Sequence, residues 1–77
     1  MSILKVKKSA NATNVWFDDQ RMHLILEDGR ELMVPLEWFP LLRDASPKQL
    51  SNWRLIGDGE GIHWEDLDED LNVEALL

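Results

Sequence analysis

Two apolar runs joined by an Asp-Gly pair constrain this chain more than any other feature. The runs lie within residues 21–36, RMHLILEDGRELMVPL, and are separated by Asp28 and Gly29. Such a pair predicts a β-hairpin with a two-residue type I′ loop, because both loop positions then need φ > 0, which Gly adopts freely and Asp tolerates. We therefore expect an antiparallel hairpin to organise the fold.

The two-residue loop also predicts the register of the hairpin. Leu24 would face Met33, and His23 would face Val34. Because side chains alternate along a strand, the two faces can be assigned. They are expected to carry His23, Ile25, Leu32, Val34 and Leu36 on one side, and Met22, Leu24, Leu26, Met33 and Pro35 on the other. Both faces are largely apolar, which predicts that each is at least partly covered.

Short strands are expected before the hairpin. Residues 3–8 mix apolar side chains with lysines, which suits the edge of a sheet. Residues 15–17 form a second apolar run, residues 9–14 would connect the two, and residues 18–20 would turn into the hairpin. The first half of the chain is therefore expected to form an antiparallel meander of three or four strands.

Two short helical segments are expected in residues 37–53. In the first, Trp38, Leu41 and Leu42 recur at helical spacing and would form one apolar stripe. Pro40 suits the first turn of this segment, where its missing N–H is not needed.

The second helical segment has the clearest start in the chain. Ser46 is placed to cap it, Pro47 takes the first helical position, and Gln49 completes a capping box. Leu50 and Trp53 would then share one face of this helix.

A second hairpin is expected over residues 55–64, with a glycine-rich tip at Asp58-Gly59. An acidic segment, residues 65–71, follows it with a leucine every four residues. Asn72 is placed to cap a final turn. The side chains expected to point inward from that turn are those of Val73, Leu76 and Leu77.

Together these segments predict one small α+β domain over residues 1–77. It would consist of an antiparallel β-meander in residues 1–36, one or two short helices in 37–53, and a second hairpin with an acidic tail in 54–77. A chain this short buries only about 60% of its unfolded surface, and four tryptophans would enlarge the core. Dimerisation is a second way to reach sufficient burial.

The composition excludes several classes of protein. The chain has no cysteine, which excludes a disulfide, a thiolate nucleophile and a zinc–thiolate site. It has no apolar run of the roughly 18 residues needed to span a membrane. The lysines near the N-terminus are not followed by the apolar segment of a signal peptide. We therefore expect a cytoplasmic protein.

The formal net charge of −7 is concentrated at one end of the chain. Residues 1–54 hold eight Lys or Arg and seven Asp or Glu, whereas residues 55–77 hold eight Asp or Glu and no Lys or Arg. This asymmetry suggests an electrostatic partner. An acidic surface repels phosphate, which argues against direct nucleic-acid binding, and it attracts a basic protein.

Five stretches of the chain match a known family, and they are residues 34–40, 46–53, 57–64, 67–71 and 73–77. In these stretches the chain resembles the bacterial domain-of-unknown-function family 2442. The resemblance implies a small α+β fold with an antiparallel sheet and a bacterial accessory protein, often encoded beside another small protein in what look like toxin–antitoxin pairs. Some relatives carry a helix-turn-helix after this domain, a role that does not carry over to a chain that stops at Leu77.

Two acidic motifs fail as ligand sites. Asp66, Asp68 and Asp70 have the spacing of a calcium loop, but the glycine and the glutamate that such a loop needs are missing. Residues 57–61, GDGEG, have the glycines of a phosphate cradle but acids where a cation is required, which favours a tight turn. No cofactor is expected.

His63 lies among carboxylates and supports an alternative function. With Glu60, Glu65 and Asp66 nearby it could join a metal site or act as a base, which would make the protein a small metal-dependent hydrolase. The competing interpretation is a structural strand residue between two apolar neighbours.

The leading hypothesis is a non-enzymatic protein-binding module. Its acidic, tryptophan-containing C-terminal surface would bind a basic protein partner, because tryptophan is enriched in binding hot spots and acids select a basic partner. An antitoxin-like role is the form that the family resemblance implies. The candidate partner-binding residues are Trp38, Trp53, His63, Trp64, Asp66, Asp68, Glu69 and Asp70.

Overall fold

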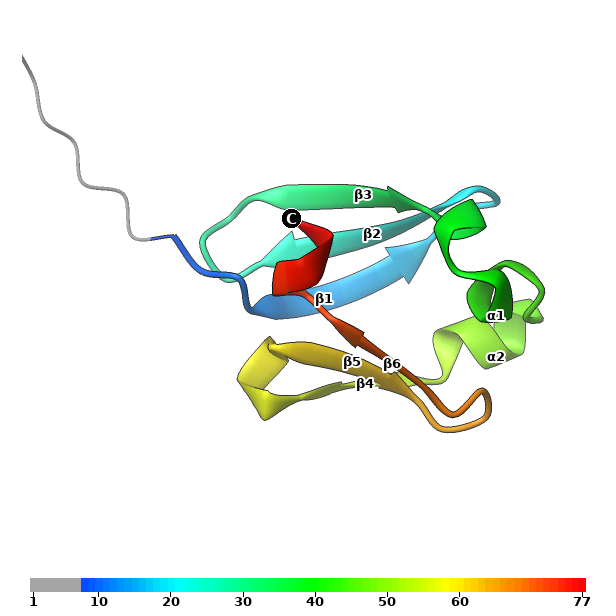
Figure 1. The fold of residues 1–77 in the computed structure, drawn as a ribbon. Coiled ribbons are helices and arrows are strands. Elements are labelled where there is room, and N and C mark those ends of the chain that lie inside the picture. The colour runs from blue at the N-terminus through cyan, green and yellow to red at the C-terminus, as the bar shows by residue number, and fades with distance from the viewer. Residues whose placement is uncertain (1–7) are drawn as a thin grey trace, which may run out of the picture.

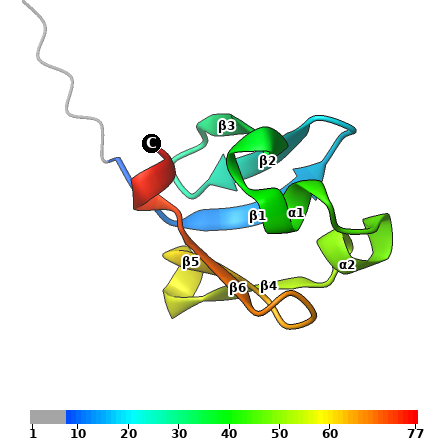
Figure 2. The same cartoon turned by 45° about the vertical axis from the view of Figure 1, so that its right-hand side comes forward.

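The computed structural model describes residues 8–77 as two three-stranded antiparallel sheets with short helices at one end (Figure 1, Figure 2). The strand order is β1-β2-β3 in the first sheet and β4-β5-β6 in the second. This is the single α+β domain with antiparallel sheets that the sequence predicts. Apart from Lys8, the strand expected in residues 3–8 lies outside the described residues.

The elements follow one another with short connections. The first sheet consists of β1 (Ala12–Phe17), β2 (Arg21–Leu26) and β3 (Glu31–Pro35). The helical elements between the sheets are η1 (Leu36–Trp38), α1 (Pro40–Arg43) and α2 (Pro47–Ser51). The second sheet and its turns are β4 (Trp53–Ile56), η2 (Gly57–Gly59), β5 (Gly61–Trp64), β6 (Glu69–Asn72) and η3 (Glu74–Leu76).

The central hairpin forms, but the predicted loop is wrong. Gly29 has φ 93, whereas Asp28 does not have a positive φ. The Gly29 N–H donates to the Leu26 carbonyl at 2.9 Å, and the Leu26 N–H donates to the Arg30 carbonyl at 2.8 Å. These bonds describe a three-residue loop, a type I turn followed by a left-handed glycine.

The longer loop shifts the hairpin register by one residue. Leu24 pairs with Leu32, and His23 pairs with Met33. Such a shift exchanges the faces of one strand relative to the other. The inner face consequently carries Met22, Leu24, Leu26, Leu32 and Val34. Met33 lies on the outer face beside His23 and is 58% exposed, so the predicted grouping of Val34 with His23 is wrong.

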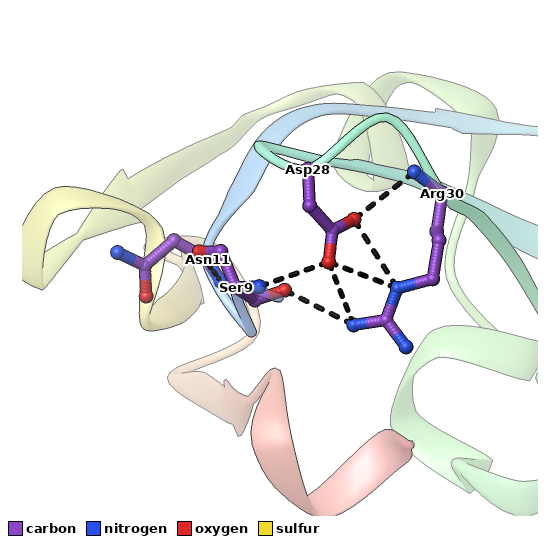
Figure 3. Close-up of polar contacts among 4 residues, drawn as sticks. All are labelled: Ser9, Asn11, Asp28 and Arg30. Carbon is purple, nitrogen blue, oxygen red and sulfur yellow. Dashed lines mark hydrogen bonds and ion pairs between the residues drawn. The ribbon is translucent and has the colours of Figure 1, made fainter. Parts of the chain in front are cut away.

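Asp28 fixes this loop and ties the preceding chain to it (Figure 3). Its carboxylate accepts hydrogen bonds from the Arg30 N–H at 3.1 Å and from the Ser9 N–H at 2.9 Å. The Arg30 guanidinium bonds the same carboxylate at 2.9 Å and also donates to the Ser9 carbonyl. These contacts, of which the Arg30 side-chain bond is the strongest cause, lower the pKa of Asp28 to about 2.

The core lies between the two sheets. Trp64 is fully buried, packs edge-on to Phe17 with ring centroids 6.3 Å apart, and donates its indole N–H to the Leu50 carbonyl at 3.0 Å. One aromatic side chain thus joins β5, β1 and α2. The buried apolar residues are Ala12, Val15, Met22, Leu24, Leu26, Val34, Leu36, Leu42, Ile62, Trp64 and Val73.

The first helical segment is interrupted, so its predicted apolar stripe is wrong. Phe39 is extended (φ −129, ψ 91) and separates η1 from α1. Leu42 is buried, but Trp38 and Leu41 are 64% and 52% exposed. Pro40 takes the first position of α1, as predicted.

The capping box of α2 is confirmed, although the helix is shorter than expected. The Gln49 N–H donates to Ser46 Oγ at 3.1 Å, and the Ser46 N–H donates to Gln49 Oε1 at 2.9 Å. The helix ends at Ser51, and Trp53 begins β4. The prediction that Leu50 and Trp53 share a helix face is therefore wrong.

The acidic segment after the second hairpin forms a strand. Residues 69–72 are β6, which pairs with β5 and completes the second sheet. Asn72 caps the last turn as predicted, since its Oδ1 accepts from the Ala75 N–H at 3.2 Å. Val73 is fully buried there, but Leu77 is 56% exposed, so its predicted inward position is wrong.

Gly59 lies where the second hairpin meets the first strand. It has φ +97, and a Cβ at this position would lie 2.2 Å from the carbonyl oxygen of Ala12. Gly29 has a similar φ of +93, but a Cβ there would meet nothing within 4 Å. Substitutions at these two glycines therefore distinguish the cost of a left-handed backbone from the cost of a steric clash.

We predict that Gly59→Ala destabilises the protein far more than Gly29→Ala. The left-handed conformation costs an alanine about 1–2 kcal/mol at either site. At Gly59 the clash with Ala12 adds at least about 2 kcal/mol, as for other overpacked sites. Urea unfolding of the two variants measures the difference, and equal losses of unfolding free energy would contradict the close approach.

We also predict that Asp28→Asn removes a pH-dependent part of the stability. Because the pKa is lowered from 3.8 to about 2, the charged Asp28 stabilises the fold above pH 3.8, and this contribution is lost as the pH falls through about 2. Urea unfolding between about pH 2 and 6 should show a shallower decline for the variant. Glu27→Gln, which removes an equal charge from the same loop, should keep the wild-type profile.

Candidate protein-binding face of the second sheet

The outer face of the second sheet carries two rows of cross-strand neighbours. In one row Arg54 on β4 pairs with His63 on β5, which pairs with Asp70 on β6. Strand alternation places the next outward row two residues along. That row consists of Ile56, Gly61 and Asn72.

His63 is held between two carboxylates. Its Nδ1 contacts Asp70 Oδ1, its Nε2 lies 3.2 Å from Glu65 Oε2, and the side chain is 14% exposed. The hydrogen bond with Asp70, and then the one with Glu65, raise the pKa of His63 above its ordinary value, while burial acts in the opposite direction. The two carboxylates therefore stabilise the imidazolium form of His63 relative to the neutral ring.

Arg54 extends this network to the sheet edge. Its guanidinium lies 3.4 Å from Glu65 Oε1. Glu65 thus faces two cations, and its pKa is lowered, chiefly by the hydrogen bond from His63. Among residues 8–77, this is the one ion pair that joins an Arg or Lys to a carboxylate of the C-terminal third.

The other carboxylates of this sheet surround the row. Asp58 and Glu60 are exposed in the β4–β5 connection, and Asp66 and Asp68 are exposed in the turn between β5 and β6. Glu69 is half-buried on β6. Seven of the eight acidic residues of the C-terminal third therefore lie on one sheet or in its connections, and Glu74 lies beyond the sheet on η3.

A shallow hollow of about 280 Å³ lies in the outer face beside Gly61, where the Ile56 side chain packs so closely that a Cβ would lie 2.9 Å from its Cγ1. Ile56 provides an apolar wall, and carboxylates of Glu60 and Asp70 lie at its rim. The complete lining is Ile56, Gly57, Glu60, Gly61, Asp70, Leu71 and Asn72. An apolar wall with acidic rim groups suits the alkyl stem and charged head of a basic side chain.

The structure does not assemble the predicted tryptophans into one patch. Trp64 is fully buried, so its assignment as a partner-binding residue is wrong. Trp53 is half-buried and lines a small cleft with Arg54 and His63. Trp38 is exposed, but it lies on η1, which follows the first sheet rather than the acidic one.

Sequence reasoning missed Arg54 and the hollow beside Gly61. Both depend on residues 69–72 forming a strand, because only then does Asp70 lie across from His63. The sequence gives no alternating signal for this strand, because Leu71 is the one apolar residue in 69–72 and Glu, Asp and Asn are depleted in strands.

Residues 8–77 contain neither a cluster of possible metal ligands nor a membrane-spanning helix. No group of three or more His, Asp or Glu side chains in that part of the chain is placed to hold a metal ion. No helix there is both long enough and apolar enough to cross a membrane.

Comparisons with known proteins identify relatives but no activity. Residues 12–77 match the sequence profile of the family described as "Protein of unknown function (DUF2442)". The fold is similar to the crystal structure of a protein of unknown function from Rhodospirillum rubrum, with 34% sequence identity and a TM-score of 0.75 over 86% of this chain and 82% of that one. A search of curated proteins found no match.

We predict that His63→Gln changes stability in a pH-dependent way. Because the pKa of His63 is raised above 6.5, its ion pairs stabilise the fold fully below pH 6.5, and this contribution is lost as the pH rises through the folded-state pKa. The free energy of unfolding of the wild-type protein should therefore exceed that of the variant most at low pH. The difference should shrink at alkaline pH. Urea unfolding between about pH 5.5 and 9 measures it.

The matched control is Asp70→Asn, which removes the larger cause of the shift. In this variant an NMR titration of His63 should give a lower pKa than in the wild-type protein. An unchanged pKa would contradict the role of Asp70.

Proposed function

We propose a function for this chain, which belongs to the DUF2442 family of proteins of unknown function, from its own geometry. It is a small, non-enzymatic protein-binding module whose acidic second sheet docks a basic protein partner. The observation that carries the proposal is that seven of the eight carboxylates in residues 55–77 lie on the second sheet and its connections, with one arginine pairing.

The charge arrangement supports this function physically. Exposed carboxylates on one side of a small protein produce a local negative potential that steers a basic protein and speeds its association. Arg54 and His63 offset this charge only in the row of paired residues that crosses the three strands, whereas Asp58, Glu60 and Asp68 are exposed in the connections at the two ends of the sheet.

The sheet also supplies shape. The hollow at Gly61 gives a basic side chain an apolar wall at Ile56 and two carboxylates at its rim. A contact that combines apolar burial with charge pairing discriminates better than a charged surface alone. This combination favours a protein partner over a small cation.

The biological role and the cellular location that we propose are argued from the family and from the composition. An antitoxin-like role, in which the module masks a basic partner, is one form of it and is implied by the family resemblance alone. A cytoplasmic location is part of the proposal and is supported by the absence of cysteine from the sequence.

The test uses isosteric substitutions that remove charge while keeping hydrogen-bond acceptors. In the variant Asp68→Asn, Glu69→Gln, Asp70→Asn, the affinity for a deca-lysine peptide should fall roughly tenfold, because three pairs of about 0.5 kcal/mol each are lost. Isothermal titration calorimetry at low salt measures the affinity. NMR shift mapping should locate the peptide on the outer face of β5 and β6.

The control removes the same charge from the other parts of the molecule. Glu27→Gln, Glu31→Gln, Glu37→Gln should reduce the affinity less than about threefold, because these exposed side chains lie outside the second sheet. Equal losses in the two triple variants would show that net charge alone governs binding, and the proposed docking face would then be wrong.

A further inference from the structure

A groove of about 490 Å³ runs along the free edge of β1, away from the acidic face. Residues 15–19 form one wall, and α2 with the start of β4 forms the other; both views show β1 running toward the corner made by α1 and α2 (Figure 1, Figure 2). The lining is Val15, Trp16, Phe17, Asp18, Asp19, Leu36, Arg43, Ala45, Pro47, Leu50, Ser51 and Trp53.

The lining shows that the groove borders the edge of the strand rather than a face. Val15 and Phe17 point inward and Trp16 points outward, yet all three contact the same space. Consecutive side chains alternate between the faces of a sheet. Only a space at the edge of the strand can be lined by side chains that point to both faces of the sheet.

Backbone groups of β1 point into this groove. The Asp18 N–H donates to the Arg21 carbonyl at 3.0 Å, and alternate pairs of an antiparallel ladder are bonded, so Trp16 bonds to His23 on β2. The N–H and carbonyl of Phe17 therefore point away from β2.

The groove combines these backbone groups with an apolar interior. Phe17, Leu50 and Trp53 are half-buried in its walls, and Trp16 is 43% exposed at its mouth. A free strand edge next to a side-chain pocket is the geometry by which proteins bind extended peptides, with backbone bonds for affinity and the pocket for specificity.

The rim of the groove is negatively charged. Asp18 and Asp19 lie at the end of β1. The Asp18 carboxylate is already bonded to His23 at 2.7 Å and accepts hydrogen bonds from the Gln20 and Arg21 N–H groups, so Asp19 is the carboxylate left to face a ligand. The one cation in the lining, Arg43, is already paired with Asp44 at 3.0 Å and with Glu37 at 3.5 Å. The charge left for a ligand is therefore acidic, which is complementary to a basic segment.

We propose that this groove binds an extended segment of a partner protein in which apolar and basic residues alternate. The segment pairs with the Phe17 backbone and places an apolar side chain between Phe17, Leu50 and Trp53. Its basic residues face Asp19. This site is separate from the acidic second sheet and goes beyond the function proposed for that sheet.

The experiment titrates a fluorescein-labelled peptide of four Lys-Val repeats and follows fluorescence anisotropy. Ser51→Trp fills the groove from its rim and should weaken binding at least about tenfold, as expected when a pocket contact is blocked. Ala75→Trp adds the same side chain at an exposed site on η3 and should change binding less than about twofold.

A charge-matched pair tests the same site without adding bulk. Asp19→Asn should weaken binding of the Lys-Val peptide about threefold, whereas Glu74→Gln, an equal charge loss outside the groove, should not. A peptide of identical composition with four lysines followed by four valines should bind at least about fivefold more weakly, because it cannot present alternating side chains.

The outcomes separate this proposal from the one made for the acidic sheet. Equal binding of the alternating and block peptides, or equal effects of Ser51→Trp and Ala75→Trp, would overturn the groove as the site. The triple variant at Asp68, Glu69 and Asp70 should leave affinity for the Lys-Val peptide within about threefold, so either proposal can fail while the other holds.

Discussion

The close approach of Gly59 to Ala12 is the contact on which the arrangement of the two sheets depends. A carbonyl that would lie 2.2 Å from a Cβ leaves room for no residue but glycine. This contact brings the second hairpin against the start of β1, and Trp64 then fills the space between the sheets and reaches Phe17. Without it, the apolar inner faces of two small sheets would each remain open to water.

Local signals in the sequence predict the elements of this fold better than their pairing. The capping box at Ser46 depends on residues within one turn, and it forms as predicted. The hairpin at Gly29 was also predictable, but its register was not. The register follows the loop type, and the loop is held by Asp28 through contacts with Ser9, nineteen residues away. Long-range contacts of this kind are not visible in a dipeptide motif.

For the candidate site, too, the composition predicts the charge but not the positions of the side chains. The charge count alone locates the acidic third of the chain, and the structure places most of its carboxylates on the second sheet and its connections. The count cannot show that Trp64 is buried or that Asp70 contacts His63, because both depend on β6 joining β5. His23 differs from His63 because it belongs to the first sheet. It is buried, its ring stacks on Trp16 with centroids 3.6 Å apart, and it bonds Asp18 at 2.7 Å.

Each proposed binding surface lies beside an exposed strand edge, which is β6 in the acidic sheet and β1 at the groove. Free strand edges invite unwanted pairing, and natural sheets block them. Here the outward N–H of Asp70 on β6 bonds Glu69 Oε1 at 3.2 Å, and the N–H of Val15 on β1 bonds Asn14 Oδ1 at 2.9 Å. A polar side chain from the preceding residue thus occupies one outward N–H on each edge. The charge of −7 adds repulsion between copies of the chain, and the same charge attracts a basic strand. Phe17, beside the groove, is then the position where such a strand can pair.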